Sequence, residues 1–223
     1  MRLLALETSS YSGSVAVIED DKVLCEFSIN IGPYHSEKLI PSINWVLTQV
    51  GLNCKDIEGV SISIGPGSFT SLRIGLSTAK GISFSRDLPI VGVSSLEILA
   101  MNSLLTSEQI CPVIDAKSKN IFAALYKSDY INLVNLRQEC IISIAGLKSL
   151  VKGKTMFLGD GALIYRNEIS SICGDFAVFA PSDFNVPRAS NCGLLGVRKI
   201  EKGEFDSLES IVPNYLRKSN VGI

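Results

Sequence analysis

The chain has 223 residues, with 21 basic and 22 acidic side chains that give a formal net charge of −1. A protein that held a nucleic-acid backbone alone would normally carry a cationic excess, so this balance argues against independent nucleic-acid binding. Apolar residues make up 46% and aromatic residues only 7% of the chain. This composition favours an aliphatic core of sheets covered by helices, in one large domain or two of about 100 residues each.

The N-terminal half is predicted to contain three strands followed by alternating helices and strands. Short apolar runs predict strands over residues 2–8, 14–18 and 22–29. Apolar residues then recur on one helical stripe from Ser36, a suitable N-cap, to Val50, and Gly51 ends that helix. The remaining predictions for this half are a strand at 60–64, a helix at about 68–85, a strand at 89–93 and a helix to about residue 105.

The second half repeats this order after a polar segment at residues 106–109, which predicts a domain boundary. Strands are expected at 111–116, 120–127 and 131–142, and then a helix at 146–151, a strand at 155–158, a helix from about 162, a strand at 176–179 and a helix at about 189–201. Three strands followed by alternating helix and strand predict an α/β fold of two tandem ribonuclease-H-like domains, each with a mixed five-stranded sheet. The predicted domains are residues 1–106 and the smaller 107–223.

The stretch from Gly65 to Gly75 is the most informative part of the sequence. It reads Gly-Pro-Gly-Ser-Phe-Thr-Ser-Leu-Arg-Ile-Gly. Glycines between a strand and a helix can expose backbone N–H groups to an anion. A P-loop, however, ends in Gly-Lys-Ser/Thr, and no lysine follows here until Lys80. A tight strand-to-helix turn is the alternative interpretation.

The helix after these glycines has two faces of small or apolar residues. The arc expected to cover the sheet consists of Phe69, Leu72, Leu76 and Ala79. The opposing arc consists of Ser71, Gly75, Thr78 and Ile82, with Ile74 beside them. A surface helix is normally polar on its outer face, so this pattern predicts contact with a helix of another molecule. Enclosure of the helix within the monomer is the alternative.

Two single residues belong to the first helix or its start. Trp45, the only tryptophan, lies opposite the core stripe, where either a partner or a loop of the same chain would cover it. His35 is the only histidine, so the chain offers no histidine pair for a metal and no evident nucleophile–histidine relay. We expect His35 to assist the start of the helix rather than catalysis.

Two carboxylates stand at equivalent positions of the two halves. Glu7 ends the first strand and is followed by Thr8 and Ser9, and Asp115 ends the matching strand of the second half. Such a pair could hold Mg²⁺ through water, or it could serve only the turns. The run Gly159-Asp160-Gly161 could likewise approach a nucleotide or turn the chain. These residues are candidates for a vestigial nucleotide-binding site.

The cysteines and the N-terminus bear on where the protein works. None of the six cysteines lies within four residues of another, which predicts buried free thiols rather than a zinc ribbon or redox pair. The first apolar run meets Glu7 too early for a signal peptide, and no apolar run approaches the about 20 residues of a membrane span. These features predict a cytoplasmic protein.

Over essentially its whole length, the chain resembles the TsaB (YeaZ-like) family. The matching segments are residues 4–9, 35–41, 65–75, 115–116, 159–162 and 213–217, and Gly-Pro-Gly-Ser-Phe-Thr is the most specific of them. The family usually has Asp in place of Glu7 and Gly in place of Ser71. The longer carboxylate arm weakens the argument for metal or phosphate binding, whereas serine keeps the helix face small.

The resemblance implies two tandem actin-like (ASKHA) domains and a non-catalytic paralogue of TsaD, a metal enzyme that uses paired histidines. It implies a scaffold and activating subunit of the complex that transfers a threonylcarbamoyl group to the adenosine after the anticodon, position 37, of tRNAs reading ANN codons. The implied partners are TsaD in a heterodimer, the ATPase TsaE, tRNA through the complex, and a second copy when the chain is alone.

This interpretation assigns the chain no catalytic residue and no metal, with ATP or ADP and Mg²⁺ only at interfaces of the complex. The expected partner-binding residues are Trp45, Ser71, Ile74, Gly75, Thr78 and Ile82. A small-molecule kinase of the same fold, using Glu7, Asp115 and residues 159–161 around Mg-ATP, is the alternative. Against it, Thr8-Ser9-Ser10 stands where a glycine-rich phosphate loop would follow Glu7. The lone histidine argues against a third reading, a metallopeptidase.

Overall fold

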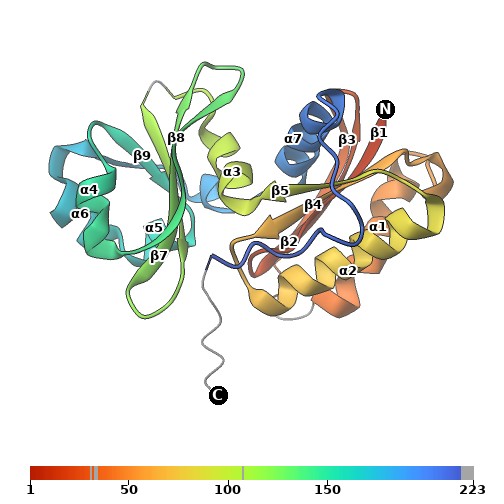
Figure 1. Cartoon of the computed structure of the whole chain (residues 1–223), viewed down its shortest axis with the longest axis horizontal. Coiled ribbons are helices and arrows are strands. Elements are labelled where there is room, and N and C mark those ends of the chain that lie inside the picture. Colours follow the sequence, from red (N-terminus) through yellow and green to blue (C-terminus); the bar gives the residue numbers. More distant parts are fainter. Residues whose placement is uncertain (31, 33–34, 107, 217–223) are drawn as a thin grey trace. The chain divides into compact units, whose positions relative to one another are not determined.

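The computed structural model describes residues 1–30, 32, 35–106 and 108–216. These residues form two compact units (Figure 1). The first contains Met1–Ile98 and Pro187–Asn214, and the second contains Leu99–Val186 together with Tyr215. Each unit is built around its own five-stranded sheet.

The sheet of the first unit has the strand order β3-β2-β1-β4-β5. Its strands are β1 (Arg2–Glu7), β2 (Ser12–Glu19), β3 (Lys22–Asn30), β4 (Gly59–Gly65) and β5 (Ile90–Ser94). β1 pairs antiparallel with β2 and parallel with β4, and β4 pairs parallel with β5. The central strand β1 is buried from Leu3 onward, as expected for a strand covered on both faces.

Helices cover both faces of this sheet. α1 (His35–Gln49) and α2 (Phe69–Arg86) lie on one face, and α7 (Ala189–Glu201) lies on the other (Figure 1). The first face holds the aliphatic core that includes Leu6, Val46 and Ile62. α7 approaches the sheet closely, because a Cβ on Gly193 would lie 2.4 Å from Cγ1 of Ile18.

The segment after α7 protects the edge strand β5. The backbone N–H of Asp206 donates to the carbonyl of Ile90 at 3.0 Å, and the carboxylate of Asp206 accepts from the N–H of Gly92 at 2.7 Å. Further along, Ile211 is buried in the core cluster on the α1–α2 face. An exposed sheet edge invites pairing with other chains, so this segment completes the unit.

The second unit repeats the topology of the first, with strand order β10-β9-β6-β7-β8. Its strands are β6 (Gln109–Asp115), β7 (Asn120–Ser128), β8 (Leu133–Ser143), β9 (Thr155–Leu158) and β10 (Ala177–Phe179), and its α-helices are α4 (Leu147–Leu150), α5 (Asp160–Ile164) and α6 (Arg166–Cys173). β6 takes the place of β1, antiparallel to β7 and parallel to β9. The predicted duplicated α/β fold with two mixed five-stranded sheets is therefore confirmed.

Short elements connect these parts. α3 (Ser95–Ala100) follows β5, and 3₁₀ turns occupy Cys54–Asp56, Met101–Ser103, Ile144–Gly146, Gly174–Phe176 and Ser182–Asn185. The helix expected to reach residue 105 thus ends its α-helical part at Ala100, and the helix expected from 162 is divided into α5 and α6. The compact units also differ from a division after residue 106, because Pro187–Asn214 packs with the first sheet.

The cysteines and the longer helices complete the description. All six cysteines are free thiols, with Cys111 and Cys192 buried, Cys54 exposed and the others half-buried. The prediction of free thiols is confirmed, and that of burial holds for Cys111 and Cys192 but not for Cys54. Among the described residues, no helix is both long and apolar enough to cross a membrane.

Candidate partner-binding surface

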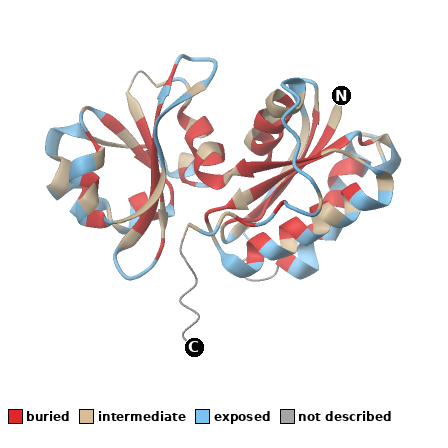
Figure 2. Ribbon diagram, in the orientation of Figure 1, coloured by how far each residue is buried: buried red, intermediate tan, exposed pale blue. Residues whose placement is uncertain are grey.

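α1 buries one side and leaves the other open to solvent, as its sequence pattern predicts. Leu39, Ile43 and Val46 face the core, while Ile40, which lies within the apolar stripe read from the sequence, is 56% exposed. Figure 2 shows the same division on both helices of this face, with buried inner sides and exposed outer sides. The outer side of α1 therefore carries an apolar residue that the described part of the chain leaves more than half exposed.

Trp45 lies on the outer side of α1 and is partly covered by its own chain. Its ring centroid is 5.0 Å from that of Phe27 on β3, with the planes tilted by 48°. The residue remains 45% exposed. The chain's own cover of Trp45 comes from the edge strand rather than from a loop and is partial, and contact of the exposed side with a partner stays a prediction.

α2 is rotated relative to the expected orientation. Its buried residues are Ser71, Leu72, Gly75, Leu76, Ala79 and Ser83. Ser71 and Gly75, expected on the partner-facing arc, lie on the buried side, while Phe69, expected over the sheet, is 53% exposed. The predicted placement of these three residues was wrong. Ile74, Thr78 and Ile82 are half-buried, and their contact with a partner stays a prediction.

The small residues on the buried side of α2 and just before it are needed because the helix lies close to another part of its own chain. A Cβ on Gly75 would lie 2.1 Å from Oγ1 of Thr8, and a Cβ on Gly67 would lie 2.2 Å from the carbonyl oxygen of Ser9. The N–H of Ser68, the residue before α2, donates to the same Ser9 carbonyl at 2.7 Å. The glycines of the Gly65–Gly75 stretch thus let α2 lie directly on the turn after β1.

The outer side of α2 carries an exposed stripe that the sequence argument missed. The members of this stripe, called here the α2 stripe, are Phe69, Arg73, Ser77, Gly81 and Phe84. Phe84 is 79% exposed, and nothing lies within 4 Å of a Cβ placed on Gly81. The guanidinium of Arg73 lies 3.9 Å from the ring centroid of Phe69. The spacing of these residues by about four positions is the sequence pattern that could have identified the stripe.

The α2 stripe has the physical character of a helix-docking surface. Aromatic side chains at both ends offer apolar area, and the small Ser77 and Gly81 between them allow a second helix to come close. Large exposed aromatic residues with Arg are typical of the centres of protein interfaces. A charged or polar residue at Phe84 would serve a permanently solvated helix better.

The turn beneath α2, called here the β1 turn, consists of Glu7, Thr8 and Ser9. All three residues are buried, and Oε1 of Glu7 accepts a hydrogen bond from the N–H of Ser9 at 2.6 Å. Burial raises the pKa of the Glu7 carboxyl, against the lowering effect of hydrogen bonds from Ser9 and Ser63. The buried site thus disfavours the charged carboxylate that would bind a cation.

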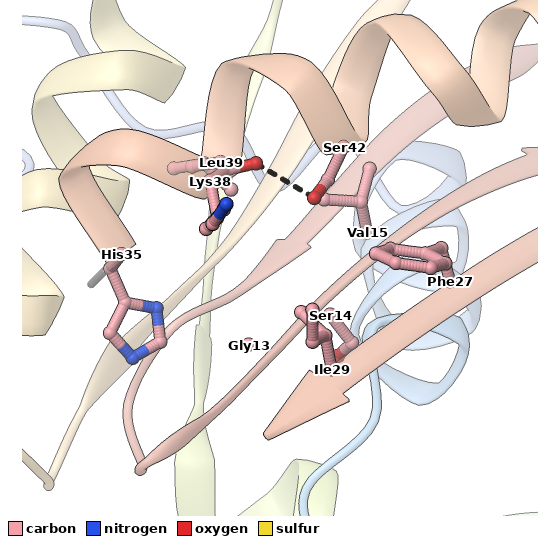
Figure 3. A pocket seen from close by; sticks show the side chains of 9 residues that line it. All are labelled: Gly13, Ser14, Val15, Phe27, Ile29, His35, Lys38, Leu39 and Ser42. Atoms are coloured by element: carbon pink, nitrogen blue, oxygen red, sulfur yellow. Dashed lines mark hydrogen bonds between the residues drawn. The ribbon is translucent and has the colours of Figure 1, made fainter. Parts of the chain in front are cut away.

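His35 occupies a small crevice at the start of α1. The crevice lies between α1 and the β2–β3 hairpin, and has room for about one water molecule (Figure 3). Nε2 of His35 lies 2.9 Å from the carbonyl oxygen of Ser10, which can only accept, so Nε2 carries the proton. Burial lowers the pKa of the ring. A neutral, buried His35 that links the helix start to the β1–β2 loop agrees with the structural role predicted for it.

The other nucleotide-site candidates belong to the second unit and also contact their own chain. Asp115 accepts hydrogen bonds from Lys117 and Tyr165, which lower its pKa although burial alone would raise it. Asp160 accepts from the N–H groups of Asp115 and Gly161, yet burial raises its pKa. Each carboxylate is thus occupied within the unit.

Gly159 and Gly161, like Gly67 and Gly75, lie close against other residues of their own chain. Gly159 has φ +106°, and a Cβ there would lie 2.3 Å from the carbonyl oxygen of Val113. A Cβ on Gly161 would lie 2.8 Å from Cγ1 of the same valine. Only glycine permits this backbone conformation and approach without strain. Among the described residues, no group of three or more His, Cys, Asp or Glu side chains is arranged to hold a metal ion.

Comparison with known proteins places the chain among proteins of tRNA modification. The family model described as TsaD, tRNA N6-adenosine threonylcarbamoyltransferase, matches residues 30–223. The tRNA threonylcarbamoyladenosine biosynthesis protein TsaB of Bacillus subtilis is 29% identical over 97% of this chain and 94% of its own length. The protein of the same name from Buchnera aphidicola subsp. Schizaphis graminum is 32% identical over 71% of this chain and 78% of its own length.

A solved structure agrees with the fold. YeaZ from Pseudomonas aeruginosa superposes with a TM-score of 0.83 and 24% identity, over 96% of this chain and 99% of that one. At this identity the likeness shows the fold alone. The fold of this chain, with its two duplicated units, is therefore shared with a protein whose sequence has diverged widely.

Proposed function

Because the chain belongs to the TsaB (YeaZ) family, within the range of the threonylcarbamoyltransferase family model, we propose that it is the non-catalytic subunit of the complex that makes threonylcarbamoyladenosine in tRNA. The chain functions in this biosynthesis as its TsaB relatives are named to do. Its own contribution is to dock on the threonylcarbamoyltransferase TsaD and activate it. The α2 stripe is the observation that carries this proposal.

The exposed apolar side chains on α2 and on the outer side of α1 support docking through these two helices. Phe69 and Phe84 are more than half exposed, and Ile40 adds apolar surface from α1. Removal of such apolar side chains from water is a main driving force of protein association. Ile74, Thr78, Ile82 and Trp45 lie half-buried or half-exposed on the same two helices and form the margin of this interface.

Catalytic silence is supported by the state of the polar groups. His35 is buried, neutral and engaged with a backbone carbonyl, so it is not available as a general base. Glu7 is buried at the end of β1, and Asp115 forms an ion pair with Lys117 at 2.8 Å. None of these groups lies free at a surface where a substrate would meet it. We propose that the reacting groups come from TsaD.

The remaining members of the assembly are assigned by charge and chemistry. A net charge of −1 supports tRNA binding mainly through other subunits. We propose that the ATPase TsaE joins the pair, that ATP or ADP with Mg²⁺ is held only at interfaces of the complex, and that two copies pair through the α2 stripe when TsaD is absent. The backbone contacts of Gly67 and Gly159 support the lack of a nucleotide site within either unit.

Phe84→Asp tests the docking proposal. Phe84 is 79% exposed, so the substitution should leave the free energy of unfolding within about 0.5 kcal/mol. It should weaken binding to the cognate TsaD at least tenfold and reduce tRNA modification in a reconstituted reaction with TsaD and TsaE. Phe176→Asp, at a 49% exposed aromatic residue of the second unit, is the matched control and should bind normally. Equal binding by both variants would overturn docking through the α2 stripe.

The kinase alternative makes an opposite prediction for the isolated chain. The TsaB relatives favour the tRNA-modification function over it. Calorimetry with Mg-ATP on the chain alone separates the two. Micromolar binding with turnover of ATP would establish a kinase, whereas absence of both in the isolated chain agrees with the subunit.

A further inference from the structure

The turn between β6 and β7 holds three successive residues in a backbone conformation that favours glycine. Lys117, Ser118 and Lys119, called here the β6–β7 turn, have φ values of +65°, +56° and +59°. Glycine adopts this left-handed region at no steric cost, whereas a residue with a Cβ is strained there. The chain nevertheless places two lysines and a serine at these positions. Because departures from local preference gather at functional sites, the side chains of this turn require an explanation.

Other parts of the second unit fix the backbone of the β6–β7 turn. The carboxylate of Asp115 accepts a hydrogen bond from the N–H of Lys117 at 2.9 Å. The carbonyl of Lys119 accepts one from the N–H of Ile144, just before α4, at 3.0 Å. These hydrogen bonds use backbone groups of the turn and leave the side chains of Ser118 and Lys119 exposed. The turn therefore presents its polar side chains from a fixed frame.

Lys119 and Lys148 carry the positive charge of this part of the second unit. Lys148 belongs to α4 and follows Ile144, which binds the backbone of the turn, by four positions. Both lysines are exposed, and neither forms an ion pair with a carboxylate of the described residues. Residues 116–128 and 140–159, which contain the turn and α4, include no Asp or Glu. The two cations thus lie on neighbouring segments that carry no negative charge of their own.

Two carboxylates lie at the base of the turn, and both are engaged by their own chain. Asp115 forms an ion pair with Lys117, and its side chain is only 6% exposed. Asp160 accepts hydrogen bonds from the N–H groups of Asp115 and Gly161. Lys117 is therefore largely compensated by Asp115, and the charge available to another molecule comes from Lys119 and Lys148.

We propose that the β6–β7 turn and α4 form a contact site for the phosphate backbone of tRNA when the chain is part of its complex. This inference rests on the proposed function. Exposed hydroxyl groups accompany the two lysines, from Ser118, Ser143 and Ser149. Lysine and serine are among the side chains that contact phosphate oxygens in nucleic-acid complexes, where they position the nucleic acid without reading its sequence. Two cations contribute to affinity but do not hold tRNA alone, in agreement with the net charge of −1.

The salt dependence of tRNA binding by the complex with the cognate TsaD and TsaE tests this site. Lys119→Gln/Lys148→Gln removes both charges and is compared with Lys127→Gln/Lys152→Gln. The control removes the same charge from exposed lysines of the same unit, and Lys127 pairs with Gln109 at the opposite end of β6. Since each phosphate contact adds about 0.7–0.9 to the slope of log K against log salt concentration, the first pair should lower the slope by about 1.5. It should also weaken tRNA binding several-fold at low salt, whereas the control pair should match the wild type.

Lys119→Gly separates contact with RNA from a structural role of the residue. Glycine relieves the left-handed strain, so the melting temperature of the isolated variant should rise. Its complex should nevertheless bind tRNA more weakly than the wild-type complex and with a smaller salt slope. A residue with only a structural role would not combine higher stability with weaker tRNA binding.

The outcomes that overturn the site differ from those that overturn the proposed function. An unchanged salt slope in the first pair, or the same loss in both pairs, would refute contact with the phosphate backbone at this site. A defect of the first pair in binding TsaE rather than tRNA would replace RNA by an acidic protein surface as the occupant. Failure of the wild-type chain to bind TsaD would overturn the proposed function, and this inference with it.

Discussion

Gly75→Ala is the substitution whose effect the structure determines most closely. The new Cβ would lie 2.1 Å from Oγ1 of Thr8 and 3.1 Å from both Cβ and Cγ2 of the same residue. Rotation of the threonine does not solve the conflict, because a β-branched side chain has few rotamers and another branch would take the place of Oγ1. Overpacking of this kind costs about 1–3 kcal/mol, against a gain of about 1 kcal/mol from replacing glycine in a helix. The net change in the free energy of unfolding is a loss of up to about 2 kcal/mol.

Gly81→Ala, six positions further along the same helix, is the matched control. Nothing lies within 4 Å of a Cβ there, so only the helix-propensity gain remains and the variant should be more stable by about 0.5–1 kcal/mol. Urea denaturation followed by circular dichroism measures both changes with unchanged m-values. Thr8→Ala combined with Gly75→Ala should recover part of the loss as a coupling energy. If Gly75→Ala were as stable as Gly81→Ala, the close contact between α2 and the β1 turn would be refuted.

Three further predictions follow from burial and hydrogen bonding. Glu7 has a raised pKa in the folded protein, so its contribution to stability is present at low pH and is lost as pH rises through the folded pKa; Glu7→Gln should therefore match the wild type in melting temperature most closely at low pH and exceed it as pH rises. Asp206→Ala removes a hydrogen bond to the β5 edge and should cost about 0.5–3 kcal/mol in urea denaturation; a change below 0.3 kcal/mol would contradict the protective role of this segment. A thiol reagent should modify the exposed Cys54 first, and Cys111 and Cys192 only on unfolding, because burial raises the pKa of both thiols and excludes the reagent.

The fold could be predicted from sequence because its signals are local. Alternating apolar runs gave the strands, and helical periodicity together with Gly51 gave α1 and its end. The repeated order of elements then predicted two similar sheets. What sequence could not give is the packing of α7 on the first sheet. That packing depends on Gly193 meeting Ile18, which lies far away in the sequence and leaves no local pattern.

The candidate site was predicted in part, and the errors have a common physical cause. Small residues on a helix indicate that something approaches closely, but they do not say whether it belongs to the same molecule. Gly75 and Ser71 were assigned to a partner, yet Gly75 lies against the β1 turn of the same chain and Ser71 is buried within the unit. The vestigial nucleotide candidates were ambiguous for the same reason, because Gly159 and Gly161 approach Val113 rather than open space.

The expectation that α2 is covered on two sides now applies to other residues than those first assigned. α2 was expected to require cover on two sides because neither side was polar. The structure covers the side of Gly75 with the chain's own sheet, and leaves Phe69 and Phe84 facing solvent on the other. Large aromatic residues on the outer side of a helix are the reverse of what a solvated helix needs. The demand for a second covering surface is therefore greater on the α2 stripe than on the arc first proposed, and it comes from aromatic area that the described residues leave exposed.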